Sequence, residues 1–146
     1  MKRASPPPSR RPVPMVAAER RIEVDALQVT LPMRVVNAKN QREHWSETAK
    51  RTKEERITTA HCMTSALAQW RFCVWVDGSI VCLTIKLTRI APCKLDSDNV
   101  QRALSAVRDG VADALGINDG SYRLTWTYEQ EQQHAYGVRI EIRERS

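Results

Sequence analysis

The chain has 146 residues, 42% of them hydrophobic, which suits one domain with a modest core. No apolar run is long enough to span a bilayer and no signal peptide is recognisable, so we expect a cytoplasmic protein without a membrane anchor. The net charge of +6 favours a polyanionic partner, while the four cysteines lack zinc-ligand spacing and are expected to be reduced and mostly buried.

Residues 1–20 differ in composition from the rest of the chain. They hold five of the seven prolines and five basic residues against one acidic residue, a net of +4 that leaves only +2 for residues 21–146. Such a segment cannot bury enough apolar surface to offset its chain entropy, which predicts a disordered basic tail over 1–20 and one folded domain over 21–146. The tail could add sequence-independent attraction to phosphates, or it could be an extension without a role.

The first predicted elements are a strand and a long helix. Leu27, Val29 and Leu31 alternate with polar residues, which is the period of a half-buried strand. A helix is then expected over 46–69, with Ser46 as its cap. Its inward stripe is expected to be Ile57, Ala60, Thr64 and Leu67, and its solvated face Lys50, Arg51, Lys53, Glu54 and Glu55.

The second half of the chain predicts a strand, a helix and two further strands. Hydrophobic and polar residues alternate over 81–88. The second helix should begin at Asp98 or Asn99 and run to about Leu115, with Gly116 as its stop signal. The final strands carry Leu124, Trp126 and Tyr128, and Val138, Ile140 and Ile142. The expected fold is therefore α+β: a single small domain in β-α-β-α-β-β order, with a mixed sheet and two helices.

The segment between the second strand and the second helix carries two carboxylates. Asp96 and Asp98 are two residues apart, so in an extended chain both side chains project to the same side. Mg²⁺ uses such closely spaced anionic oxygens and leaves its remaining positions to water and phosphate. A third acid, Asp119, follows on a turn between Asn118 and Gly120. The three aspartates are therefore candidate metal ligands.

Each of these acids also has a simpler interpretation. Asp98 could merely cap the second helix, and Asn118-Asp119-Gly120 is ordinary turn sequence. A calcium loop of the EF-hand type is excluded, because Gln101 stands where that loop needs glycine. The chain has no P-loop and no dinucleotide-binding glycine motif, so no nucleotide cofactor is expected, and the three histidines have no evident nucleophile partner.

The order of these parts resembles the RusA family of Holliday junction resolvases. The similarity rests on an early strand, an Asn- and Arg-containing loop over 37–44, a helix, a strand, the D-x-D-N segment 96–99, and the acidic turn 117–119 before a terminal strand pair. It covers residues 22–145. The resemblance implies a homodimer that binds four-way DNA junctions and cuts symmetrically placed phosphodiesters with Mg²⁺ or Mn²⁺, in recombination and repair.

Carried over by position, the family's three essential aspartates fall on Asp96, Asp98 and Asp119, and its helical lysine falls on Arg102. Arg102 keeps the charge but is a poor proton donor. Asn118 stands where the family often has a further acid, and the stretch from Asp98 to Asp119 is longer by roughly one helical turn. These departures predict an altered rate or metal preference.

The resemblance and the residue types together suggest a mechanism. We expect Asp96 and Asp98 to hold the metal against the scissile phosphate, with Asp119 completing the site. Arg102 would offset negative charge in the transition state. The candidate DNA contacts are Lys94, Arg89, Lys39 and Arg42, with Trp45 stacking on an unpaired base.

One length argues against a straight second helix. From Asn99 to Ala114 such a helix is about 24 Å long, whereas the residues from Leu115 to Asp119 reach back only about 17 Å. Asp119 can therefore rejoin Asp96 only if the helix ends or bends early, around Asp109-Gly110, or if the partner subunit donates it.

Two other functions stay open at this point. The chain could be a basic, dimeric DNA-binding protein whose acids are only caps and turns. It could also be a nuclease for forks or flaps. Cleavage of junction, fork and linear duplex in the presence of Mg²⁺ distinguishes these alternatives.

Overall fold

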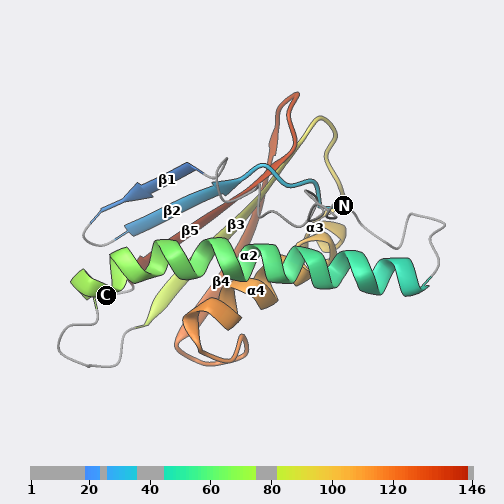
Figure 1. Ribbon diagram of the computed structural model, residues 1–146. Coiled ribbons are helices and arrows are strands. Elements are labelled where there is room, and N and C mark those ends of the chain that lie inside the picture. Colours follow the sequence, from blue (N-terminus) through green and yellow to red (C-terminus); the bar gives the residue numbers. More distant parts are fainter. Residues whose placement is uncertain (1–18, 24–25, 36–44, 75–81, 145–146) are drawn as a thin grey trace, which may run out of the picture.

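The computed structural model in Figure 1 describes residues 19–23, 26–35, 45–74 and 82–144, without the side chains of 71–74. Within these ranges the chain forms five strands and three helices. The strands are β1 (Glu19–Ile22), β2 (Ala26–Leu31), β3 (Leu83–Ala91), β4 (Leu124–Gln132) and β5 (Gly137–Glu144). The helices are α2 (Trp45–Val74), α3 (Ser97–Ala103) and α4 (Ser105–Leu115).

All five strands belong to one sheet, in the order β1-β2-β5-β3-β4. The β3–β4 pair is parallel, whereas the β1–β2, β2–β5 and β3–β5 pairs are antiparallel. The last strand, β5, therefore lies in the middle of the sheet, and β4 forms one edge. The predicted α+β class, with a single small domain and a mixed sheet, is confirmed.

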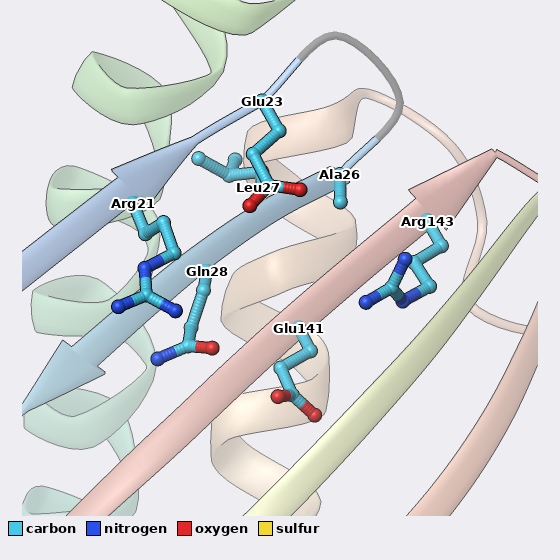
Figure 2. Close-up of a pocket in the computed structure, with 7 residues that line it drawn as sticks. All are labelled: Arg21, Glu23, Ala26, Leu27, Gln28, Glu141 and Arg143. Atoms are coloured by element: carbon cyan, nitrogen blue, oxygen red, sulfur yellow. The ribbon is translucent and has the colours of Figure 1, made fainter.

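The two faces of the sheet differ in chemistry. Alternate residues of the three central strands are buried in one core with the helices, namely Leu27, Val29, Leu31, Leu83, Ile85, Leu87, Val138, Ile140 and Ile142. On the opposite face Lys86 lies 3.2 Å from Glu141 and 3.7 Å from Glu129. Figure 2 shows Gln28, Glu141 and Arg143 on this polar face, pointing away from the helices around a hollow of about 70 Å³.

Helix α2 is longer than predicted and buries a different side. It begins at Trp45 and continues past the expected end at Gln69 to Val74. Ile57 is 55% exposed and Thr64 is also exposed, whereas Glu55, expected on the solvated face, is 8% exposed. The buried residues are Glu55, Thr59, Cys62, Met63, Ala66, Leu67 and Trp70. Leu67 of the predicted stripe is buried, whereas Ile57 and Thr64 are not, because α2 packs against α4 as well as the sheet and this contact admits small and polar side chains.

The second predicted helix is in fact two helices. Helix α3 ends at Ala103 and α4 begins at Ser105; Leu104, between them, has φ −95° and ψ 3°. The break comes before Asp109-Gly110, which lies inside α4, so the bend expected there is wrong in position. Gly116 ends α4 with a φ of 71°, which confirms the predicted stop signal.

Three smaller expectations have different outcomes. Strand β1 begins inside the segment predicted as a tail, so Glu19 belongs to the sheet, while residues 1–18 lie outside the described part of the chain. Cys62, Cys82 and Cys93 are free thiols, but of these three only Cys62 is buried. Among the described residues, no helix combines the length and apolar character that a membrane crossing needs.

Candidate active site

The D-x-D segment lies between the end of β3 and the start of α3. Asp96 is the residue at the N-cap of α3, with φ −63° and ψ 154°, and its side chain makes no capping hydrogen bond. Asp98 lies in the first helical turn. Both side chains are exposed, so neither carboxylate is committed to the core. The simpler reading of Asp98 as the cap is therefore wrong, because the cap position falls on Asp96.

Two side chains hold the loop that presents these acids. The Gln130 amide on β4 accepts a hydrogen bond from the Leu95 N–H and donates one to the Leu95 carbonyl, each at 2.7 Å. Arg89 on β3 is 9% exposed and donates from Nη1 to the Cys93 carbonyl at 2.7 Å and to Gln130 Oε1 at 3.3 Å. These contacts indicate that Arg89 holds the D-x-D loop in place from the interior of the protein.

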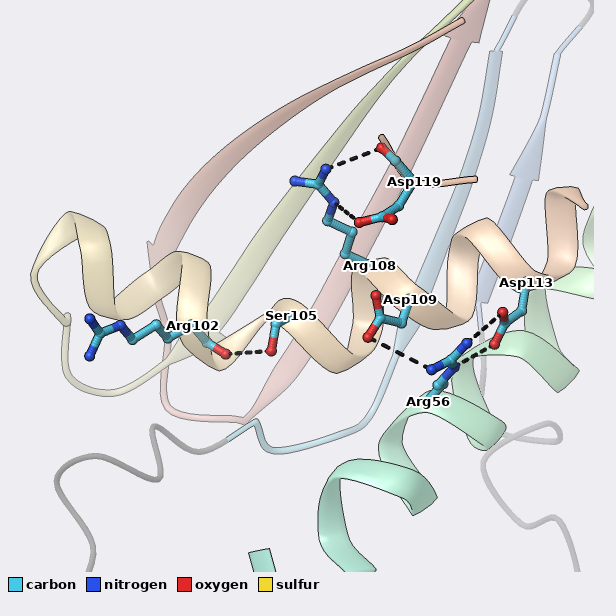
Figure 3. Close-up of polar contacts among 7 residues, drawn as sticks. All are labelled: Arg56, Arg102, Ser105, Arg108, Asp109, Asp113 and Asp119. Carbon is cyan, nitrogen blue, oxygen red and sulfur yellow. Dashed lines mark hydrogen bonds and ion pairs between the residues drawn. The ribbon is translucent and has the colours of Figure 1, made fainter. Parts of the chain in front are cut away.

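Asp119 lies on the turn after α4 and is held by Arg108 of α4 (Figure 3) and by Trp126 of β4. Arg108 donates from Nε to Asp119 Oδ2 at 3.0 Å and from Nη2 to the Asp119 carbonyl at 3.1 Å. The Trp126 indole donates to the same carbonyl at 2.8 Å. Asn118 Oδ1 accepts a hydrogen bond from the Gly120 N–H, which shapes the turn. The backbone at Asp119 is thus fixed by two donors.

A pocket of about 440 Å³ lies between α3 and the edge strand β4. Its lining residues are Ser97, Val100, Gln101, Trp126, Thr127, Tyr128, Glu129 and Gln130. One end adjoins Gln130, which holds Leu95 beside the D-x-D segment, and the other adjoins Trp126, which holds Asp119. Trp126 and Gln130 are four residues apart, so these two anchoring points are about 13 Å apart at the rise of a strand.

The three predicted metal ligands lie next to the pocket but are not part of its lining: Asp96 and Asp98 flank Ser97, and Asp119 is held by Trp126. Within the described ranges, no group of three or more His, Cys, Asp and Glu side chains is placed so as to hold one ion together. After the break at Leu104, α4 packs along α2 and carries the Asp119 turn to the far end. Asp96 and Asp98 flank Ser97 and lie beside the Gln130 end of the pocket, which is the near end; the Trp126 end is the far end.

A second charged network lies where α4 packs on α2 (Figure 3). Arg56 binds the two carboxylate oxygens of Asp113 at 2.6 and 2.9 Å and lies 4.0 Å from Asp109. The Arg56 hydrogen bond holds the pKa of Asp113 below its usual value. Partial burial raises the pKa of Asp109; Arg56 opposes this rise, and Asp119 and Asp113 add to it. The same arginine therefore leaves the pKa values of the two carboxyl groups shifted in opposite directions, up at Asp109 and down at Asp113.

The other predicted site residues lie away from the pocket or outside the described residues. Arg102 is exposed on α3, and Figure 3 shows its guanidinium extending away from Asp119. Lys94 is exposed beside the D-x-D segment, and Trp45 is 75% exposed at the start of α2. Lys39 and Arg42 fall outside the described residues.

Four contributors to the site are not evident from sequence motifs: Trp126, Tyr128, Gln130 and Arg108. The two-residue spacing of Trp126, Tyr128 and Gln130 indicates that they share one face of a strand, and this spacing could have marked them as a group. No sequence pattern marks Arg108, because the direction of its side chain depends on where the helix breaks.

Two comparisons with known proteins give no related protein. A scan against models of protein families finds no match, and a search of curated proteins also finds none. The function is therefore argued from the residues and their geometry.

Proposed function

We propose that the protein is a Mg²⁺-dependent endodeoxyribonuclease of the RusA type that hydrolyses phosphodiesters in branched DNA, such as four-way junctions. In this proposal it works as a cytoplasmic homodimer in recombination and repair. The observation that supports it most is the exposed Asp96–Asp98 pair on either side of Ser97, a residue that lines the 440 Å³ pocket. Asp119 is held by Trp126, another residue of the lining. The exposed carboxylates and the open pocket beside them suit an extended phosphodiester chain.

The donor atoms at the near end fit Mg²⁺. This ion is commonly bound by one or two protein carboxylates, with its other positions filled by water and substrate phosphate. Asp96 and Asp98 are two exposed carboxylates on one short segment, and Gln130 fixes the backbone beside them. Mn²⁺, which accepts the same oxygen ligands, would fit as well. A bound ion would polarise the scissile phosphate and lower the pKa of a coordinated water.

The residues of the chain would bind and position the DNA. Asp96 and Asp98 bind at the D-x-D end, and Lys94, exposed beside them, contacts a neighbouring phosphate and sets the register of the strand. Asp119 orients the DNA or a water molecule from the other end, with its position fixed by Arg108 and Trp126. Gln130 and Arg89 keep the D-x-D loop in place, so less ordering is needed when DNA binds.

Cleavage of a labelled four-way junction in a Mg²⁺ titration tests this function. We expect the wild type to nick the junction and to stop when the metal is chelated. Asp98→Asn should lose roughly 100-fold or more in rate, since a charged group at the reacting centre is removed, while junction binding is retained. Glu54→Gln removes an exposed acid on α2 and is the matched control. Binding without cleavage in the wild type would contradict the proposal.

One observation favours a second candidate, a DNA-binding protein without catalysis. Asp119 is paired with Arg108 and, within the described residues, does not join Asp96 and Asp98 around one ion. In that case every variant would bind the junction and none would cut it. The same assay with fork, flap and linear duplex substrates separates a junction resolvase from a nuclease for other branched DNA.

A further inference from the structure

Arg108 makes contacts with three residues at the far end of the pocket. Its Nε and Nη2 bind Asp119, as described above, and its Nη1 donates to the Tyr128 hydroxyl at 2.8 Å. The guanidinium carbon lies 4.7 Å from the centre of the Trp126 ring, in the geometry of a cation–π contact. The direction of all three guanidinium nitrogens is therefore fixed.

The position of Arg108 differs from that of Arg102 because of the helix break. Arg102 lies on α3, before Leu104, and extends away from Asp119 (Figure 3). Arg108 lies on α4, after the break, and reaches the side chains of β4. The arginine that pairs with Asp119 therefore lies on α4, whereas the family resemblance places its basic residue, Arg102, on α3.

We infer that Arg108 is the positioning residue of Asp119 and that its charge weakens the binding of metal cations at this end of the pocket. A cation approaching Asp119 would share Oδ2 with the Arg108 Nε and meet the guanidinium charge at short range. Arg108 would thereby direct the metal to Asp96 and Asp98 and keep Asp119 in one orientation. The inference rests on the proposed function in treating Asp119 as a functional residue and Asp96 and Asp98 as the metal ligands.

A purely structural Arg108 would behave differently. Its removal would lower stability and activity together and leave cation binding unchanged or weaker, because Asp119 would become less ordered. In the arrangement that we infer, the affinity for cations rises while the rate of cleavage falls. These opposite changes separate the two roles.

Terbium luminescence measures cation binding without requiring catalysis. Tb³⁺ binds carboxylate oxygens, and its emission is sensitised by a nearby indole; Trp126 touches Asp119 directly. The titration compares full-length wild type with Arg108→Gln, Arg108→Lys and Arg143→Gln. Arg143 is an exposed arginine on the polar face of the sheet, so its variant matches the change in net charge. Trp126→Phe identifies the emission that arises at this site.

We expect Arg108→Gln to bind Tb³⁺ about tenfold more tightly, because one positive charge close to the carboxylate is removed. Arg108→Lys and Arg143→Gln should stay within about twofold of the wild type, since one retains the local charge and the other is remote. Adding Asp119→Asn to Arg108→Gln should abolish the gain. Junction cleavage by Arg108→Gln should fall roughly 10- to 100-fold, as expected when a neighbour that orients a functional group is lost.

An Arg108→Gln variant that is folded and binds Tb³⁺ no more tightly than the wild type overturns the inference. If that variant does not fold, Arg108→Met, which keeps an apolar stem beside Trp126, replaces it. A wild type that never cuts DNA would refute the proposed function, yet the terbium comparison would still decide the role of Arg108. A wild type that cuts, with unchanged terbium binding in Arg108→Gln, would refute this inference alone.

Discussion

Asp109 and Asp113 show how one helix places two chemically identical side chains in opposite electrostatic settings. They are one turn apart on α4, both face Arg56, and their side chains are 41% and 42% exposed. Arg56 donates two hydrogen bonds to Asp113 but reaches Asp109 only at 4.0 Å. Burial therefore dominates at Asp109 and raises its pKa, whereas the hydrogen bond dominates at Asp113 and lowers its pKa.

The two pKa shifts predict opposite effects of amide substitutions on stability. Folding disfavours the charged form of Asp109, so its ionisation costs stability as the pH rises through the ordinary range of an aspartate, and the cost is absent in acid. Asp109→Asn should therefore raise the free energy of unfolding at pH 7 by a few tenths of a kcal/mol, a small effect because the side chain is partly solvated. The gain should vanish below the ordinary pKa range.

Asp113→Asn is the matched comparison and should have the opposite sign. The charged form of Asp113 is favoured in the folded state, so its contribution is present at neutral pH and lost as the pH falls through its lowered pKa. Urea unfolding of both variants and the wild type at several pH values measures these differences. Equal pH profiles for the two variants would contradict the assignment of burial and hydrogen bonding as separate causes.

At the scale of elements, Gly110 determines how closely α4 approaches α2. A Cβ placed there would lie 2.6 Å from the Arg56 carbonyl oxygen and 2.7 Å from Thr59 Cβ. Gly110→Ala should therefore destabilise the protein by about 1–3 kcal/mol through overpacking, in spite of the roughly 1 kcal/mol by which alanine favours a helix interior. Thermal and urea unfolding measure the change.

Gly120→Ala is the control for Gly110→Ala. Its Cβ would lie 3.4 Å from Asn118 Oδ1, an ordinary contact, so the substitution should change the free energy of unfolding by less than about 0.5 kcal/mol. If Gly110→Ala proved as stable as the wild type, the close contact between α2 and α4 would be wrong.

The elements also show what local sequence can and cannot predict. Strands β2, β3, β4 and β5 were predictable because alternation such as that of Leu27, Val29 and Leu31 reports directly on which face is buried, whereas β1 was not predicted. The buried side of α2 was not, because it depends on α4, a partner more than thirty residues away along the chain. The break at Leu104 has the same origin: a buried leucine between two helices carries no local stop signal of the glycine or proline kind.

At the scale of the molecule, the acids of the candidate site could be selected from the sequence, but their arrangement could not be predicted. The D-x-D spacing makes Asp96 and Asp98 candidates because it is a local feature. The two hydrogen bonds between the Leu95 backbone and the Gln130 side chain join residues 35 positions apart. They form because the parallel pairing of β3 and β4 places Gln130 beside Arg89 at the edge of the sheet. Pairing of this kind follows from the strand order, which alternation alone does not determine.

The separation of the acids leads to a last prediction, on how a homodimer would use them. In each subunit, Trp126 and Arg108 hold Asp119 at the pocket that the same chain's α3 lines. We therefore expect each pocket to use its own Asp119. A heterodimer of Asp98→Asn and Asp119→Asn, isolated with two different tags, would then have one defect in each pocket.

Such a heterodimer should cut a labelled four-way junction no faster than either parent variant. The control is a heterodimer of wild type and Asp119→Asn, which retains one intact pocket and should still nick one strand. If Asp119 instead acted in the partner's pocket, the first heterodimer would contain one complete set of acids and would regain nicking. Recovery to the level of the control would therefore contradict the arrangement within one chain, and it would make dimerisation a requirement of the chemistry as well as of junction symmetry.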